Sequence, residues 1–229
     1  MRSGYETIED LLIKRDSAII RSELEGLVLD VGCGNGFVTY KHSFAVGVDI
    51  RPQPCKIPLV AGDMHYLPFK SNTFDVTIFC HTLEHTPHPS AALDEAYRVI
   101  KDDGKIVVSA PNARYILWPY YLARRQFIYA KEHKSVFTFT TLKILLEKKG
   151  FTVTKLFTSG GVSSKSFIPL VAVLIQKLVE KGILLQVTDK LSSLHPLFSY
   201  EVIIVAYKNP KEVCKIRSAR PQIKLAKAC

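Results

Sequence analysis

A loop with three glycines at alternate positions is the part of the sequence best suited to bind a ligand. In the segment LVLDVGCGNGF, residues 27–37, Gly32, Gly34 and Gly36 follow an apolar run that contains Asp30. Glycine carries no side chain that would block a ligand, and it adopts the backbone angles of a tight turn. A dinucleotide-binding fingerprint, GxGxxG, would place its third glycine where this sequence has a phenylalanine. The spacing GxGxG therefore points away from NAD.

Two more aspartates end apolar runs further along the chain. Asp49 follows FAVGV and Asp63 follows IPLVAG. A carboxylate at the end of the second strand of an α/β sheet can accept hydrogen bonds from both hydroxyls of a ribose. We expect Asp49 to be this hydroxyl clamp. The alternative for each aspartate is a cap on a loop or a helix.

Histidines are the candidates for acid–base chemistry. His81 and His85 lie in FCHTLEHTPHP, directly after an apolar run, and imidazole titrates close to neutral pH. Either could be a general base, and a packing or capping role is the alternative. The pair could also suggest a metal site, but the HExxH pattern is absent and Pro87 would break a helix before His88. We therefore expect no metal.

These residues require a scaffold, and the chain alternates strand-like with helix-like segments. The strand candidates are rich in Val and Ile and span residues 27–31, 44–50, 57–63, 74–80, 105–110, 151–157 and 200–208. Helices are expected from an N-cap at Ser90 to a stop at Gly104, and over residues 140–150. This alternation predicts a doubly wound α/β sheet. Ligands in such sheets bind beyond the carboxyl ends of the strands, where the glycine loop begins.

Four motifs in this order resemble the class I S-adenosylmethionine-dependent methyltransferases. They are VLDVGCGNG, GVDI, GDMHYLPFKSNTFDVTIFCHTLEH and RVIKDDGKIVVSAPN, and they resemble in particular the small-molecule branch of ubiquinone and menaquinone biosynthesis methyltransferases. The resemblance implies S-adenosylmethionine as the cofactor. It also implies a Rossmann-like sheet of seven strands, mostly parallel, with the last strand, here residues 200–208, antiparallel.

The resemblance assigns roles to residues of this sequence. Asp63 would accept from the adenine amino group, Met64 would pack on the adenine ring, and His81 and His85 would face the transferable methyl group. The full expected set of cofactor-binding residues is Asp30, Gly32, Cys33, Gly34, Gly36, Asp49, Asp63, Met64 and Cys80.

The sequence departs from the family between its early strands. Residues 37–43 leave room for about two helical turns, and Pro52 and Pro54 leave none for the usual second helix. We expect one face of the sheet to be thinly covered, by the N-terminal segment or by the partner subunit of a homodimer. Residues 1–208 should form one domain, with residues 160–199 inserted as a lid or interface helix. Residues 209–229 form a basic tail.

Composition narrows the function further. The chain has 229 residues, a net charge of +10 and five scattered cysteines, which suggests neither a disulfide framework nor a zinc cluster and favours a cytoplasmic location. The expected acceptor is a small, apolar or lipid-like molecule, with peripheral membrane contact left open. Two alternatives stay open: an RNA-modifying or RNA-binding protein that uses the basic tail, and an inactive cofactor-binding protein. Nucleic acid is disfavoured, because no NPPY-like motif follows the fourth strand.

Overall fold

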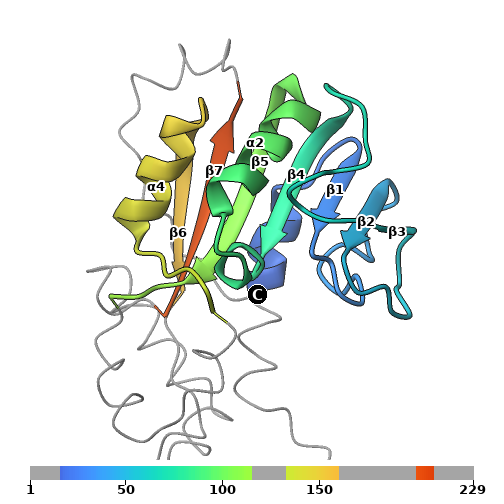
Figure 1. The fold of residues 1–229 in the computed structure, drawn as a ribbon, viewed down its shortest axis with the longest axis horizontal. Coiled ribbons are helices and arrows are strands. Elements are labelled where there is room, and N and C mark those ends of the chain that lie inside the picture. Colours follow the sequence, from blue (N-terminus) through green and yellow to red (C-terminus); the bar gives the residue numbers. More distant parts are fainter. Residues whose placement is uncertain (1–15, 115–132, 160–199, 209–229) are drawn as a thin grey trace, which may run out of the picture.

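The strands form one seven-stranded sheet. The computed structural model describes residues 16–114, 133–159 and 200–208 (Figure 1). The spatial order of the strands is β3-β2-β1-β4-β5-β7-β6. Their bounds are β1 Val28–Val31, β2 Ala45–Asp49, β3 Leu59–Ala61, β4 Phe74–Cys80, β5 Ile100–Pro111, β6 Thr152–Ser159 and β7 Glu201–Tyr207. All seven predicted strands are present.

The direction of the strands matches the expected Rossmann-like arrangement. The first five strands pair in parallel, and β7 lies antiparallel between β5 and β6. The chain order reverses between β1 and β4, so the carboxyl ends of β1, β2 and β4 meet at one edge of the sheet. A ligand site is expected at such a point of reversal.

Helices α2, Pro89–Val99, and α4, Phe139–Lys148, cover one face of the sheet (Figure 1). Buried side chains of both helices pack with Leu29, Val31 and Phe79 of the strands. The prediction that the first of these helices runs from an N-cap at Ser90 to Gly104 is wrong at both ends: His88 is the N-cap, and the helix stops at Val99.

Helix α2 ends early because the chain pairs with β4. The helix begins after His88, and the chain is extended from Ile100. There the backbone of Thr73 donates to the Val99 carbonyl, and Ile100 pairs with Phe74. Pairing with β4 therefore ends the helix before the glycine does. For α4, Thr138 and Thr141 form a reciprocal capping box that defines its start.

The opposite face is covered by the N-terminal helical residues 16–22. Ile19 and Ile20 pack with alternate strand residues, including Val76, Ile78 and Val107. Glu23, 6% exposed, accepts from Lys155 Nζ at 2.8 Å and so ties the end of this segment to β6. The expected loss of helices between the early strands is confirmed: residues 37–43 form turns, and the described residues between β2 and β3 contain no helix. Coverage by the N-terminal segment is also confirmed for the part that is described.

Several expectations fall outside the described residues. These concern the N-terminal segment before position 16, the insertion at 160–199 and the basic tail. Within the described ranges, no helix combines the length and the apolar character needed to cross a membrane.

Candidate active site

A cavity of about 640 Å³ lies at the carboxyl ends of the first four strands. It is within the size range of small-molecule and cofactor sites. The lining residues come from the ends of β1 to β4, from the loops that follow them, and from the segment before α4: Val31, Gly32, Val48, Asp49, Ile50, Arg51, Gly62, Asp63, Met64, His65, His81, Thr82, His85, Thr86, Pro87 and Lys134.

The glycine loop turns sharply where β1 ends. Its three glycines have positive φ angles of 67°, 53° and 72°. At Gly32 an added Cβ would lie 2.5 Å from the Thr82 side chain, and the Gly32 N–H donates to the Val48 carbonyl at 2.7 Å. Only glycine satisfies both the backbone angle and the close approach. This turn places the loop against the end of β2 and leaves open the space above it.

Asp49 connects the glycine loop to the end of β2. Its Oδ2 accepts from the Gly34 N–H and its Oδ1 from the Arg51 N–H, both at 2.9 Å. The carboxylate is thereby fixed at the edge of the cavity, and each oxygen keeps a further lone pair. Asp49 thus lines the cavity, and its role as the hydroxyl clamp stays a prediction.

Asp63 and Met64 line the cavity beside Asp49. His65 donates to Asp63 Oδ1 from its backbone N–H at 2.9 Å, and its Nδ1 lies 2.6 Å from the same oxygen. The backbone hydrogen bond, and then the imidazole, lower the pKa of Asp63 despite partial burial. His65 Nε2 lies 2.8 Å from Thr86 Oγ1 and so bridges the two sides of the cavity. The spacing of the sequence did not reveal this role of His65.

Asp30, Cys33 and Cys80 do not line the cavity. Asp30 is 2% exposed and accepts from Thr39 Oγ1 at 2.8 Å beneath the glycine loop. Burial raises its pKa to about 6. Cys33 points back toward Gly47, and Cys80 contacts Ser109. Burial raises the pKa of both thiols, that of Cys80 to about 12. Both side chains pack against the apolar cluster that contains Ile19 and Ile20.

His81 stands at the end of β4 with a positive φ of 51°, which is unusual for a residue with a side chain. Its Nε2 lies 2.8 Å from Glu201 Oε1, and its Nδ1 lies 3.3 Å from Glu84 Oε1. Burial lowers the pKa of His81, but the charge and hydrogen bond of Glu201, together with Glu84, outweigh it and hold the pKa well above its usual range. The ring is therefore held as a cation near neutral pH.

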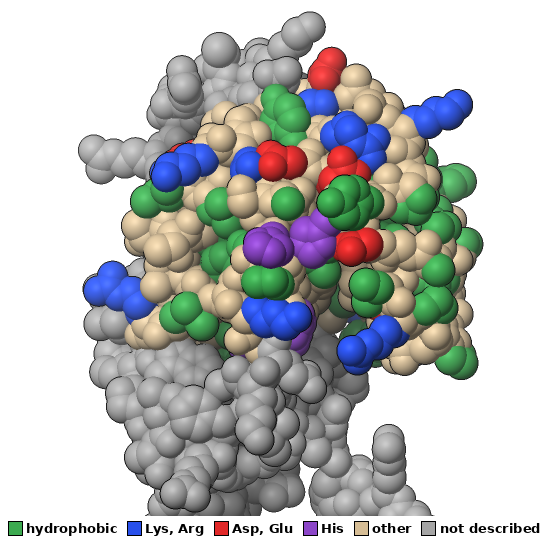
Figure 2. All heavy atoms as spheres, in the orientation of Figure 1, with side chains coloured by type: hydrophobic (Ala, Val, Ile, Leu, Met, Phe, Trp, Pro, Cys, Tyr) green, Lys and Arg blue, Asp and Glu red, His purple; other side chains and the backbone are tan. Residues whose placement is uncertain are grey.

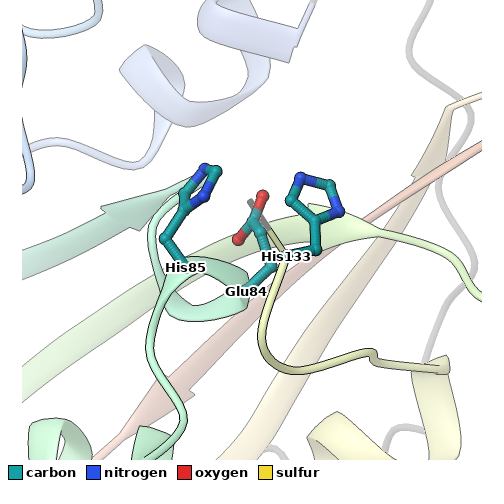
Figure 3. A group of neighbouring side chains, drawn as sticks. All are labelled: Glu84, His85 and His133. Carbon is teal, nitrogen blue, oxygen red and sulfur yellow. The ribbon is translucent and has the colours of Figure 1, made fainter. Parts of the chain in front are cut away.

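His85 belongs to the short helix η1, Leu83–His85, and faces a second histidine (Figure 3). The ring centroids of His85 and His133 are 5.1 Å apart, edge to face. Figure 3 shows the Glu84 carboxylate between the two rings. His133 is far from His85 in the sequence, so spacing could not have associated them. In Figure 2 histidine side chains gather near the middle of one face, with acidic side chains beside them.

The chain is similar in sequence to known methyltransferases. Residues 29–108 match the family described as "Methyltransferase domain". The chain is 37% identical over 110 residues to an uncharacterised protein of Methanocaldococcus jannaschii, covering 44% of this chain and 43% of the relative. It is 34% identical over 116 residues to the chloroplastic 2-methyl-6-phytyl-1,4-hydroquinone methyltransferase of Spinacia oleracea, covering 42% of this chain and 34% of the relative. The chain thus spans less than half the length of these two curated relatives.

The fold is also similar to solved structures. A crystal structure of an S-adenosylmethionine-dependent methyltransferase of Thermotoga maritima superposes with a TM-score of 0.64 at 18% identity, over 88% of this chain and 91% of that one. At this identity the similarity establishes the fold. The superposed share of the chain is larger than the segment that the family model matches, residues 29–108.

Proposed function

We propose, on the premise that residues 29–108 belong to the class I S-adenosylmethionine-dependent methyltransferases, that the chain methylates a small, apolar or lipid-like acceptor. The observation that carries the proposal is the position of Asp49. Its carboxylate is fixed by the glycine loop at the edge of a cavity of cofactor size. The residues present therefore fit S-adenosylmethionine.

The cofactor contacts follow from the order of residues along the cavity. Asp49 would accept from the ribose hydroxyls, and Gly32 would leave room for the amino-acid part. Asp63 receives both His65 contacts on Oδ1, so its Oδ2 is placed to accept from the adenine amino group. Met64 packs on the core and lines the cavity, as a residue that covers the adenine ring should.

S-adenosylmethionine supplies a methyl group that is already activated on a sulfonium. The chain has to align the acceptor with that group and to exclude water. The side of the cavity formed by His81, His85, Thr86 and Lys134 would hold the acceptor. Since His81 is held as a cation, the role of proton acceptor falls to His85 when the acceptor is a hydroxyl.

The apolar acceptor is supported by the names of relatives. The relative in Spinacia oleracea is a phytyl-hydroquinone methyltransferase. A second relative, in Ruegeria sp., is a ubiquinone/menaquinone biosynthesis C-methyltransferase, 47% identical over 49 residues. Both names describe rings that carry, or are destined to carry, a long apolar chain.

Calorimetry and methyl transfer would test the proposal. S-adenosylmethionine and its demethylated product should bind, and NAD should not. Labelled methyl groups should then appear in quinone or lipid extracts and not in RNA. Transfer to RNA would support the alternative acceptor class, and binding without any transfer would support an inactive cofactor-binding protein.

A further inference from the structure

We propose that Glu84, His85 and His133 bind a divalent transition-metal ion, such as Zn²⁺, at the acceptor side of the cavity. One ligand atom from each of the three residues lies within 4.8 Å of the others. A role of this ion in catalysis depends on the proposed methyltransferase function. Binding of the ion follows from the three side chains alone.

The backbone brings His133 to Glu84. The N–H groups of Lys134 and Ser135 both donate to the Glu84 carbonyl, at 2.7 and 3.0 Å. Ser135 Oγ also donates to the Thr86 carbonyl at 2.7 Å. Three hydrogen bonds therefore fix this segment against η1, independently of the imidazole rings. The juxtaposition in Figure 3 is thus a product of the fold.

Glu84 provides the second observation, because its carboxylate is almost fully buried. The residue is 2% exposed, and neither carboxylate oxygen has a hydrogen-bond partner within the described residues. His81 Nδ1 forms an ion pair with Oε1 at 3.3 Å, while Oε2 points to no such group. A buried carboxylate is costly unless a charge or hydrogen bond compensates it. His81 compensates Oε1 only, and a cation between Glu84 and the two imidazoles would compensate Oε2.

The ligand set selects the type of ion. Two imidazole nitrogens and one carboxylate oxygen suit Zn²⁺ and its first-row neighbours, whereas Mg²⁺ and Ca²⁺ prefer oxygen ligands. Bonds of about 2.1 Å to a common ion place two ligand atoms at most about 4.2 Å apart, so small side-chain rotations must close the cluster. Three protein ligands leave a position open, as in catalytic zinc sites.

The open position on the ion would be available to the acceptor. His85 lines the cavity, so the ion would lie at its wall and could bind an oxygen of the acceptor. With the ion bound, the lone pair of His85 is used for coordination. The ion would then replace His85 in activating a hydroxyl, whose proton leaves to solvent. The sequence argument against a metal concerned only the pair His81 and His85. In the structure His81 forms ion pairs with Glu201 and Glu84, and His133 takes its place beside His85.

Equilibrium dialysis of the untagged full chain against Zn²⁺, followed by elemental analysis, tests the site. The wild type should retain one Zn²⁺ per chain. His133→Ala should weaken binding by more than the roughly 10- to 100-fold that loss of an outer-shell partner costs. His88→Ala is the matched control, because His88 is exposed, lies outside the cluster and caps α2 without a side-chain hydrogen bond. Equal retention of Zn²⁺ by the wild type and His133→Ala overturns the proposal.

A measurement on the wild type guards against a variant that fails to fold. In the chain labelled with ¹⁵N-histidine, Zn²⁺ should shift the imidazole resonances of two histidines, and both shifts should be absent in His133→Ala if that variant is folded. No shift in the wild type overturns the proposal. Titration of the demethylated cofactor in the same samples separates the two proposals. If the chain binds the cofactor but not Zn²⁺, the metal site is refuted and the methyltransferase proposal stands. If it binds Zn²⁺ but not the cofactor, the metal site stands and the methyltransferase proposal is refuted.

Discussion

Replacing Asp49 by Asn should weaken binding of the demethylated cofactor while the fold is kept. The carboxylate accepts from two backbone N–H groups and still offers lone pairs to the two ribose hydroxyls. The amide keeps one acceptor oxygen and loses the charge. Its NH₂ group cannot accept, either from a hydroxyl or from the Gly34 N–H.

The size of the effect follows from the charge. Hydrogen bonds to charged groups contribute about 1.5–3 kcal/mol. Loss of the charged acceptor should therefore raise the dissociation constant by roughly 10- to 150-fold. Asp103→Asn is the matched control, because it removes the same charge from an exposed residue away from the cavity. It should bind the cofactor as the wild type does.

A second ligand separates the ribose contact from a change in the glycine loop. An analogue of the demethylated cofactor without the ribose hydroxyls should bind the wild type weakly, and Asp49→Asn should not weaken it further. This comparison is a double-mutant cycle in which one change is made in the ligand. Calorimetry that gives the variant an affinity within about threefold of the wild type, with a normal melting curve, would refute the role of Asp49.

Three predictions concern stability and the loop. Asp30→Asn should flatten the pH dependence of the unfolding free energy, measured by urea titration. In the wild type, burial raises the pKa of Asp30 from 3.8 to about 6, so the unfolding free energy should fall by about 3 kcal/mol as the pH rises through that interval. Gly32→Ala should destabilise the fold by at least about 1–2 kcal/mol, since alanine is strained at a φ of 67° and would meet Thr82, and an unchanged melting temperature would contradict the geometry of the turn. Thr138→Ala should cost about 1 kcal/mol in urea unfolding by removing the capping box of α4, whereas Thr138→Ser should retain most of it.

Much of the scaffold could be predicted because the strands are buried on both faces. In the sequence such strands are short apolar runs, and a polar residue such as Asp49 or Asp63 marks where each run ends. The pattern did not give the direction of β7, which came from the family resemblance. The end of α2 was missed because hydrogen bonds from residues 72 and 73, which precede β4, decide it, and no local signal reports them.

The two ends of the cavity differ in how well the sequence predicts them. At the cofactor end Asp49 is the last residue of β2 and Asp63 lies two residues after β3, so the sheet sets their positions. At the acceptor end His133 reaches the site through a connection that docks on η1, and His65 reaches it by bridging Asp63 and Thr86. These contacts join residues that share no periodicity. Sequence reasoning therefore found the carboxylates and missed two of the histidines.

The distribution of charge across the cavity bears on the acceptor. Asp49 and Asp63 line one end, which suits the hydroxyls, the amino group and the positive charge of the cofactor. Lys134 lines the other end, beside His81, whose charge is paired with Glu201 and Glu84. The Lys134 ammonium would favour an acceptor with an electron-rich oxygen, such as a phenolate or enolate, and a metal ion held by Glu84, His85 and His133 would strengthen that preference. An acceptor that is itself a cation, such as a protonated amine, would be repelled at the same place. We therefore expect an oxygen-bearing ring rather than a basic amine as the methyl acceptor, whether oxygen or the adjacent ring carbon receives the methyl group.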